Sequence, residues 1–305
     1  MASAFGSNTT ADQVLAGHDL SGRTLIVTGA NTGIGEATAC ALAGAGAHVI
    51  FACRRADTAQ AAIARTRALH PTAKVSFVEL DLGAFASIRQ FADTIGSERI
   101  DALVCNAGLS VTRWTPTAEG YESTVGVSHI GHYLLARLLM PKLLASGNPR
   151  VVMVSSSSHR MPARLDFEKL PMSANNFNGL NAYGQAKLCN ILMAKSLQRR
   201  YGDRGLTACA LHPGTLVTTD IGRNSGFVSL LIKLVSPITK SPAQGAATSV
   251  WALVHEPASE LAGQYLKDCA VTTCSNEAND AGVADRLWSM SEDWVARNTQ
   301  VPAWP

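Results

Sequence analysis

A glycine-rich turn between a strand-forming run and a helix-forming run constrains the fold more than any other feature. Residues 24–28 (TLIVT) are a short β-branched run that predicts a buried strand, and residues 33–44 predict a helix of small residues. The segment that joins them reads TGANTGIG (28–35). Glycines at this spacing permit a tight turn, the approach of a pyrophosphate to the backbone, and close packing of helix on sheet. We expect nucleotide phosphates at the helix N-terminus, and a glycine-rich turn without a ligand is the alternative.

The alternation of apolar strand and helix continues along the chain. Further strands are expected at 48–53, 74–80, 101–105, 150–155 and 206–211, with helices near 57–69, 84–95, 118–145 and 182–201. Strands that are apolar on both faces are typical of a parallel sheet covered on both sides. No linker and no repeat interrupts the pattern. We expect an N-terminal extension over 1–22 and then one α/β domain over 23–305, a Rossmann-type doubly wound parallel sheet of about seven strands with helices on both faces.

Composition excludes several classes of protein. Apolar residues make up 47% and charged residues 16%, so the chain can bury a large core. Its 26 basic and 23 acidic residues nearly balance, and no basic run occurs, so no nucleic-acid partner is expected. Seven cysteines without a Cys-x-x-Cys pair favour reduced thiols in a cytoplasmic protein. We expect no membrane span, because no apolar stretch reaches about 18 residues, and no signal peptide, because the first 22 residues have no basic region followed by an apolar core.

The end of the second strand indicates which dinucleotide is bound. NAD-binding proteins usually carry a carboxylate about 20 residues after the glycine motif, for the ribose 2′-hydroxyl. Arg54 and Arg55 stand there instead, and the first acid is Asp57. Because a guanidinium suits a 2′-phosphate, NADP(H) is expected; two solvated arginines at a helix start are the alternative. Asp81, followed by Leu82 after the third strand, could accept a hydrogen bond from adenine or could cap a helix.

A tyrosine and a lysine four residues apart suggest acid-base chemistry. Tyr183 and Lys187 share one face of a predicted helix. A tyrosine ordinarily has a pKa near ~10, and a nearby ammonium lowers that pKa by favouring the phenolate. The pair therefore suits a general acid/base with an electrostatic helper. The serines at 155–158 add a hydroxyl at the same sheet edge, which strengthens a signal that is weak alone.

Together these motifs resemble the short-chain dehydrogenase/reductase family over nearly the whole chain. The matching segments are TGANTGIG (28–35), CNAG (105–108), the serine after the fifth strand, YGQAK (183–187) and HPG (212–214). Other segments are similar to the retinol dehydrogenase branch, and most similar to its dehydrogenase domains that accompany WW modules: ACRR (52–55), SHIGHYLL (128–135), VSSSSHR (154–160), AYGQAKLCNIL (182–192) and SPITKSPAQGAATSVW (236–251). No WW module is expected in this chain.

The resemblance implies NADP(H)-dependent interconversion of an alcohol and a carbonyl, with hydride moving between the nicotinamide C4 and the carbonyl carbon. Tyr183 would transfer the proton, and Lys187 would bind the nicotinamide ribose and lower the Tyr183 pKa. Ser156, the second serine of its pair, would bind the substrate oxygen. The cofactor-binding residues, those of the glycine motif included, would be Gly29, Asn31, Thr32, Gly33, Ile34, Gly35, Arg54, Arg55, Asp81, Leu82, Asn106, Ala107, Gly108, Tyr183, Lys187, Pro213, Gly214 and Thr218.

One catalytic position departs from the family pattern. The branch pattern Asn-His-x-Gly-His reads Ser128-His129-Ile130-Gly131-His132 here. The family asparagine is associated with a water that relays protons from the lysine, and a serine offers a different donor and acceptor set. A modified relay through Ser128 is expected; a weakened enzyme and a relay through Asn190 are the alternatives. The two histidines are interpreted as packing residues, and no metal site is expected.

The substrate would lie against two long loops, about 157–181 and 214–242, which follow strand ends. Together with the loop after CNAG they supply the expected substrate residues Leu109, Trp114, Ser158, Phe177, Leu216 and Phe227. This largely apolar set suits a hydrophobic carbonyl or alcohol. Simple packing of Phe227 in a short helix, or a contact with another subunit, is the alternative.

Other functions stay open from the sequence. The family also reduces activated C=C bonds, and Ser128 is compatible with a weakly active cofactor-sensing protein, although Ser156, Tyr183 and Lys187 argue against that. Nucleotide-sugar epimerisation is disfavoured, because few residues follow Gly214 to form a substrate domain. The resemblance also implies a homodimer or homotetramer through the long helices near 118–145 and 182–201.

Overall fold

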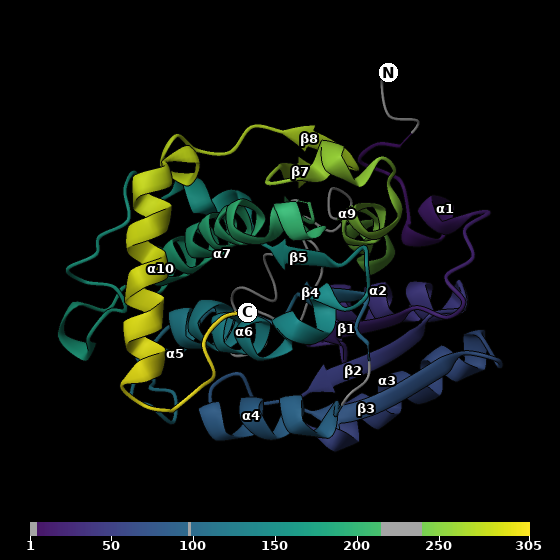
Figure 1. The fold of residues 1–305 in the computed structure, drawn as a ribbon, viewed down its shortest axis with the longest axis horizontal. Helices are drawn as coiled ribbons and strands as arrows, with labels where there is room; N and C mark the ends of the chain where they lie inside the picture. Colours follow the sequence, from purple (N-terminus) through teal and green to yellow (C-terminus); the bar gives the residue numbers. More distant parts are fainter. Residues whose placement is uncertain (1–4, 97–98, 215–239) are drawn as a thin grey trace.

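The computed structural model describes residues 5–96, 99–214 and 240–305, which form one eight-stranded sheet between two layers of helices (Figure 1). The strand order is β3-β2-β1-β4-β5-β6-β7-β8. Neighbouring strands pair in parallel except for β7 and β8, which form an antiparallel hairpin at one edge. The order reverses between β1 and β4, as in a doubly wound sheet, so the expected Rossmann-type α/β fold is confirmed.

The six predicted strands occur within one residue of their expected ends. They are β1 (Thr24–Thr28), β2 (His48–Cys53), β3 (Lys74–Glu79), β4 (Ala102–Cys105), β5 (Arg150–Val154) and β6 (Thr207–His212). Two more, β7 (Tyr265–Lys267) and β8 (Ala270–Thr272), raise the number above the expected seven. Their turn, Asp268 and Cys269, has φ of 54° and 57°. Such turns favour asparagine and glycine, so the sequence carries no strong hairpin signal there.

The helices pack on both faces of the sheet. They are α1 (Ala11–Leu15), α2 (Gly33–Gly44), α3 (Ala56–Leu69), α4 (Phe85–Thr94), α5 (Ser123–Val125), α6 (Gly131–Leu144), α7 (Gly179–Tyr201), α9 (Pro242–Val254) and α10 (Ala281–Ala296). Short 3₁₀ turns are η2 (Ser157–Arg160), η3 (Ala174–Asn176), η4 (Gly202–Arg204), η7 (Ala258–Leu261) and η8 (Glu277–Asn279).

The single helix predicted near 118–145 is wrong in its first part. The helical segment begins at α5, where the Glu122 carboxylate accepts from the N–H groups of Thr124 (2.7 Å) and Val125 (3.0 Å). The π-helical turn η1 (Gly126–Ile130) then joins α5 to α6. A π turn widens the helix locally and is frequent at functional sites. It contains Ser128, the residue that departs from the family pattern.

Alternate strand residues face opposite helix layers, which explains the continuous apolar runs. Ile26 and Leu103 belong to the cluster that packs on α4, α6, α7 and α10. Leu25 and Val104 belong to the cluster that packs on α1, α2, α3 and α9. A strand covered on both faces must be apolar at consecutive positions.

The N-terminal segment adds to the second of these clusters. Thr10 and Gln13 form a capping box that starts α1. Ala11, Val14 and Leu15 are buried in the same cluster as residues of α2 and α9. The described part of the expected extension therefore packs against the domain.

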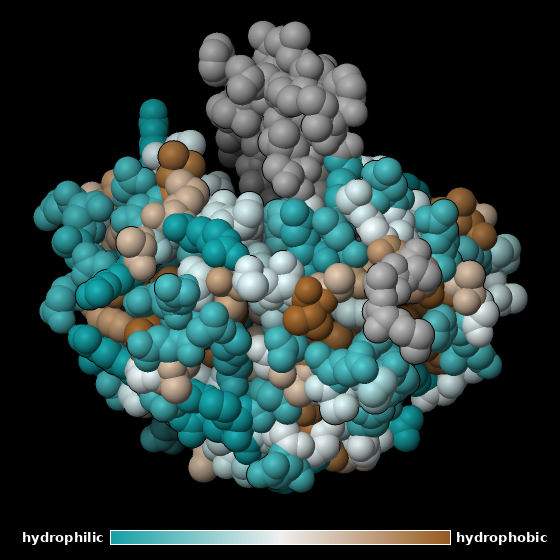
Figure 2. Space-filling view, turned by 90° about the horizontal axis from the view of Figure 1, so that it is seen from above, coloured by the Kyte–Doolittle hydropathy of each residue, from teal (hydrophilic) through white to brown (hydrophobic). Residues whose placement is uncertain are grey.

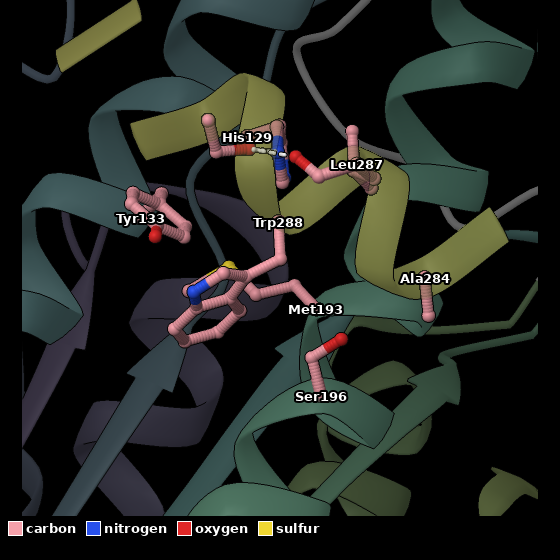
Figure 3. Close-up of a pocket in the computed structure, with 8 residues that line it drawn as sticks. His129, Tyr133, Met193, Ser196, Ala284, Leu287 and Trp288 are labelled. Atoms are coloured by element: carbon pink, nitrogen blue, oxygen red, sulfur yellow. Dashed lines mark hydrogen bonds between the residues drawn. The ribbon is translucent and has the colours of Figure 1, made fainter. Parts of the chain in front are cut away.

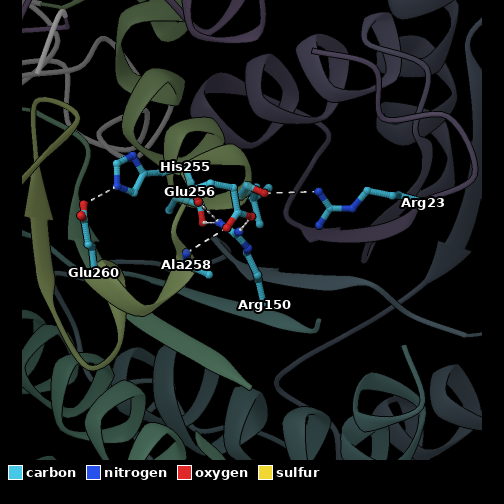
Figure 4. Close-up of polar contacts among 8 residues, drawn as sticks. Arg23, Arg150, His255, Glu256, Ala258 and Glu260 are labelled. Atoms are coloured by element: carbon cyan, nitrogen blue, oxygen red, sulfur yellow. Dashed lines mark hydrogen bonds and ion pairs between the residues drawn. The ribbon is translucent and has the colours of Figure 1, made fainter. Parts of the chain in front are cut away.

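At the amino end of the sheet, two arginines donate hydrogen bonds to main-chain carbonyls at the C-terminal end of α9 (Figure 4). The buried Arg150 guanidinium donates to the carbonyls of Ala252 (3.0 Å) and His255 (2.9 Å) and pairs with Glu256. Arg23 donates to another carbonyl of the same turn at 3.3 Å. Cations at a helix C-terminus satisfy its last carbonyls and its dipole. This end of the molecule lies opposite the strand ends that carry the candidate site.

The C-terminal helix α10 packs across α6 and α7, the helices through which the resemblance implies oligomerisation (Figure 1). Trp288 meets Tyr133 edge to face with ring centroids 5.0 Å apart, and Trp304 lies 4.7 Å from Trp288. Figure 3 shows Trp288 and Tyr133 beside His129 in a pocket that has no room for a water molecule. The chain's own C-terminal segment therefore covers part of these two helices.

The surface seen from above is mostly hydrophilic, with apolar side chains in small separate groups (Figure 2). The large apolar side chains that are exposed include Leu69, Met161, Leu180 and Val271. Among the described residues, no helix combines the length and the apolar character that crossing a bilayer requires.

Candidate active site

The glycine turn brings the N-terminus of α2 to the carboxyl end of β1. Gly29 and Gly33 have φ of 65° and 58°, which favours glycine. A Cβ atom on Gly35 would lie 2.3 Å from the Gly29 oxygen and 2.4 Å from Asn106 Nδ2. No side chain fits at Gly35, so the helix start packs directly on the turn and on the end of β4. This backbone arrangement fits a pyrophosphate at the α2 N-terminus.

Thr28 fixes the start of the next loop. Its hydroxyl accepts from the N–H groups of Asn106 (3.0 Å) and Ala107 (2.9 Å), and Asn106 Nδ2 donates to the Thr28 carbonyl at 2.9 Å. The CNAG segment is therefore attached to the glycine turn. This role of Thr28 was not predicted, because its only signal in the sequence is a polar residue at the end of an apolar strand.

The expected serine, tyrosine and lysine meet at the ends of β5 and α7. Lys187 is buried, and its Nζ lies 5.5 Å from the centre of the Tyr183 ring. Ser156, half-buried, makes a hydrogen bond to Tyr183. Ser155 instead donates its hydroxyl to the Lys187 carbonyl at 2.6 Å and is buried. Ser156 is thus the serine of the pair with its hydroxyl at the tyrosine.

Burial sets the protonation of the tyrosine and the lysine. Desolvation raises the pKa of Tyr183, and the Ser156 hydrogen bond opposes that rise. Desolvation lowers the pKa of Lys187 to about 8. The expected lowering of the Tyr183 pKa is not seen here. The reason is burial, which is the largest cause of the rise in the Tyr183 pKa, while Lys187 Nζ donates to the Val154 carbonyl at 3.0 Å.

Ser128 lies beside Lys187. A Cβ atom on Gly108 would be 3.2 Å from both Lys187 Nζ and Ser128 Oγ. Asn190 Nδ2 donates to the same Val154 carbonyl as the lysine, at 3.1 Å. Within the described structure, Ser128 Oγ and Asn190 Oδ1 are buried and make no hydrogen bond. Two polar atoms near the lysine are therefore available to a water molecule.

The arginines lie beside the glycine turn. Asn31 Nδ2 donates to Thr58 Oγ1 at 3.2 Å, which connects the turn to the first turn of α3. Arg55 pairs with Asp57 at 2.5 Å, and both side chains are largely exposed. Arg54 is exposed and makes no ion pair within the described residues. Of the two expected arginines, Arg54 is therefore the one whose guanidinium is not already paired with a carboxylate in the described structure.

The chain forms a turn directly after β3. The Asp81 carboxylate accepts from the Gly83 N–H at 2.8 Å, so one of its oxygens has a structural role. Leu82 is buried, and a Cβ on Gly131 would lie 2.3 Å from its carbonyl oxygen. The end of β3 therefore packs on the start of α6.

Two of the loops that carry the expected substrate residues contact one another. Trp114 Nε1 donates to the Met172 carbonyl at 3.0 Å, which ties the loop after β4 to the loop after β5. Leu109 and Phe177 are half-buried, and Ser158 accepts from the Ser156 hydroxyl at 3.3 Å. Pro213 and Gly214 are buried at the end of β6. The predictions for Leu216, Thr218 and Phe227 fall outside the described residues.

The two histidines near Ser128 make protein hydrogen bonds. His129 Nε2 lies 2.9 Å from Ser291 Oγ, and His132 bridges the Ser128 carbonyl (3.0 Å) and Thr28 Oγ1 (2.9 Å). Burial lowers the pKa of His129 to about 3 and that of His132 to about 4. No group of three potential metal ligands lies together in the described part of the chain.

A glycine turn after β1, with Ser156, Tyr183 and Lys187 at the neighbouring strand ends, is the arrangement of a Rossmann-fold dehydrogenase. The profile described as short chain dehydrogenase matches residues 23–166. The chain is 40% identical to the WW domain-containing oxidoreductase of Danio rerio, over 98% of this chain and 74% of that protein. It is 38% identical to retinol dehydrogenase 12 of Mus musculus, over 88% of this chain and 85% of that protein.

A solved structure agrees with these matches. An uncharacterized protein from Mycobacterium paratuberculosis superposes with a TM-score of 0.73 at 31% identity, covering 91% of this chain and 94% of that one. The chain belongs to the short-chain dehydrogenase/reductase family and is an oxidoreductase of that family. The resemblance to the retinol dehydrogenase branch, and to dehydrogenase domains of WW proteins, is confirmed.

Proposed function

We propose that this protein is an NADP(H)-dependent oxidoreductase that interconverts a hydrophobic alcohol and its aldehyde or ketone. The observation that carries the proposal is the convergence of Ser156, Tyr183 and Lys187 beside the glycine turn. The bound nicotinamide would supply or accept the hydride. The side chains of the protein would bind the substrate oxygen, orient it and move its proton.

Tyr183 acts as the general acid in carbonyl reduction and as the general base in alcohol oxidation. Ser156 already makes a hydrogen bond to the Tyr183 phenol, so a substrate oxygen bound by both residues would lie between them. Lys187, protonated below its pKa of about 8, places a positive charge near the ring and favours the phenolate.

Ser128 and Asn190 support a modified proton relay. Both side chains place a buried oxygen without a hydrogen bond near Lys187. A water held there would connect the lysine ammonium to a serine hydroxyl, which both donates and accepts. These two buried oxygens support the proposal of an active relay rather than an inactive enzyme, with Asn190 as a second anchor for the same water.

The preference for NADP(H) rests on charge at the end of β2. Arg54 is exposed next to the glycine turn, and no acidic residue ends the strand. Asp57 is paired with Arg55, so its charge is already balanced. A 2′-phosphate would gain a charge-assisted hydrogen bond from Arg54, whereas a 2′-hydroxyl would gain far less.

A hydrophobic substrate agrees with the side chains near the first turn of α7. Leu180 is exposed one turn before Tyr183, and Met161 is exposed beside Gly184. Helical residues three to four positions apart lie on one face, so an apolar substrate part could rest here. Two exposed apolar side chains beside the reacting group suit a hydrophobic substrate better than a sugar.

Location and assembly are further parts of the proposal. All seven cysteines are free and all but Cys40 are buried, which suits the reducing cytoplasm. A homodimer or homotetramer would need surface other than the part of α6 and α7 that α10 covers, or would include α10 itself.

Oxidation of NADPH and of NADH by the purified protein tests the proposal. The panel would contain aliphatic and aromatic aldehydes, aryl ketones, ketosteroids, retinal and enones, with products identified by mass spectrometry. We expect an alcohol product and faster turnover with NADPH. A saturated ketone from the enones alone would instead favour C=C reduction. Tight NADPH binding without turnover of any compound would favour a sensing role.

A further inference from the structure

The peptide group that follows Ser156 is held from both sides by buried histidines. Its carbonyl oxygen belongs to Ser156 and its N–H to Ser157. The oxygen lies 2.6 Å from His159 Nδ1, and the N–H donates to His212 Nδ1 at 3.3 Å. In a trans peptide these two groups point in opposite directions, so the two contacts together fix the orientation of the peptide plane.

The contacts assign opposite tautomers to the two rings. A carbonyl oxygen only accepts, so His159 carries its proton on Nδ1, and its Nε2 accepts from the Ser275 N–H at 3.2 Å. A peptide N–H only donates, so His212 Nδ1 must be unprotonated and its proton is on Nε2. Burial lowers the pKa of both rings, that of His212 to about 4, so both are neutral at pH 7.

His212 belongs to the sheet, whereas His159 lies in η2 together with the serines and packs against the sheet. His212 ends β6 and pairs with Lys267 of β7. His159 packs edge to face on Tyr265 of β7, with ring centroids 4.9 Å apart. The position of the serine loop is therefore set by the β6–β7 edge.

The hydrogen bonds of the serine side chains within this turn do little to fix the orientation of the loop. Ser156 Oγ accepts from the Ser158 N–H at 3.2 Å and donates to Ser158 Oγ at 3.3 Å, both long contacts within the same turn. Ser157 is exposed.

His212 is buried, and its Nε2–H makes no hydrogen bond within the described residues. A buried donor without a partner is costly, and an apolar side chain at this place would avoid that cost.

We propose that His212 is a positioning residue, which accepts the Ser157 N–H at Nδ1 and thereby aims the Ser156 hydroxyl at Tyr183 and the substrate oxygen. The proposal deepens the proposed function and rests on it for its catalytic consequence. His159 holds the other side of the same peptide. Neither ring needs to touch the substrate for this role.

Two substitutions separate the nitrogen atoms of the ring. His212→Asn keeps a hydrogen-bond acceptor near the position of Nδ1, and His212→Gln places its amide near the position of Nε2. We expect His212→Asn to keep kcat within about threefold and His212→Gln to lower it at least about tenfold, with the Kd of NADPH unchanged in both. In a Ser156→Ala background, His212→Gln should add no more than about a twofold loss. Equal kcat for the two variants, or a full tenfold loss on top of Ser156→Ala, would overturn the proposal.

Amide hydrogen exchange gives a readout that needs no substrate. The Ser157 amide should exchange slowly in the parent and in His212→Asn, and at least about tenfold faster in His212→Gln. Exchange that is equally fast in all three proteins would overturn the His212 contact itself. A parent protein that protects this amide but reduces no carbonyl would instead contradict the proposed function.

Discussion

Lys187 Nζ donates a hydrogen bond to the main-chain carbonyl of Val154, 3.0 Å away. This contact joins α7, which carries the tyrosine, to the end of β5, which leads into the serine loop. It also holds a buried ammonium whose pKa burial lowers to about 8. The lysine is therefore fixed between the two elements that supply the rest of the site, and its charge depends on pH in the physiological range.

Replacement of the tyrosine should remove the chemistry and leave cofactor binding intact. Tyr183→Phe deletes the proton donor, so kcat for carbonyl reduction should fall about 10²- to 10⁴-fold. Stopped-flow or steady-state NADPH oxidation measures the loss, and quenching of intrinsic fluorescence measures the Kd of NADPH. Ser155→Ala is the matched control, because Ser155 is bonded to a helix carbonyl. Near-normal turnover in Tyr183→Phe would refute the assignment.

The arginines at the end of β2 should contribute unequally to cofactor choice. Arg54→Ala should raise the KM for NADPH about 10- to 100-fold, because a hydrogen bond to a charged phosphate is lost, and change the KM for NADH little. Arg55→Ala should have a smaller effect, since Arg55 is paired with Asp57. Steady-state kinetics with both cofactors decide the point. Equal effects of Arg54→Ala on both would show that this side chain does not contact the 2′-phosphate.

The serine in the π-helical turn should tolerate the family residue. Ser128→Asn should leave kcat unchanged or raise it, because an amide can also hold a water beside Lys187. Ser128→Ala removes the hydroxyl and should lower kcat about tenfold. The pH dependence of kcat for the three proteins is the measurement. A large loss in Ser128→Asn would mean that the turn is shaped for a hydroxyl and not for a general water site.

Acid should destabilise the fold through its buried histidines. His129, His132 and His212 have pKa values of about 3, 4 and 4, all lowered by burial. Between about pH 6.5 and 4 the unfolded chain binds more protons than the folded one, so the free energy of unfolding falls as pH falls. Each histidine contributes up to about 1.4 kcal/mol per pH unit in this window.

Urea unfolding at several pH values measures this slope. His129→Asn should reduce this slope by the contribution of about one bound proton, up to about 1.4 kcal/mol per pH unit. A slope that is the same in His129→Asn and in the parent would show that His129 does not resist protonation in the folded protein.

Local pattern predicted most of the sheet, because the inner parallel strands β1, β2, β4, β5 and β6 are buried on both faces. It failed where structure depends on helix caps and turns, or on distant partners, rather than on apolar spacing. The start of the helix near 118–145 is set by the Glu122 cap and by the π turn, neither of which changes the apolar spacing. The strands β7 and β8 are too short to show an alternation of apolar and polar residues, and their hairpin depends on the pairing of β7 with β6.

The candidate site was predicted residue by residue from the glycine, serine and tyrosine–lysine motifs. The role of Thr28 and the histidine contacts to the serine loop could not be predicted, because these contacts join segments that are far apart in the sequence. The Tyr183 pKa was expected to be lowered by its neighbour. Burial raises the Tyr183 pKa instead, and the burial of this side chain is a property of the folded structure.

The most direct test of the account is hydride tracing with NADPH that carries deuterium at the nicotinamide C4, prepared in both diastereomers. The account predicts that one diastereomer transfers a single deuterium to the carbinol carbon of the alcohol product, and that Tyr183→Phe abolishes the transfer. Deuterium at the carbon β to a retained carbonyl, or no deuterium in any product, would contradict it.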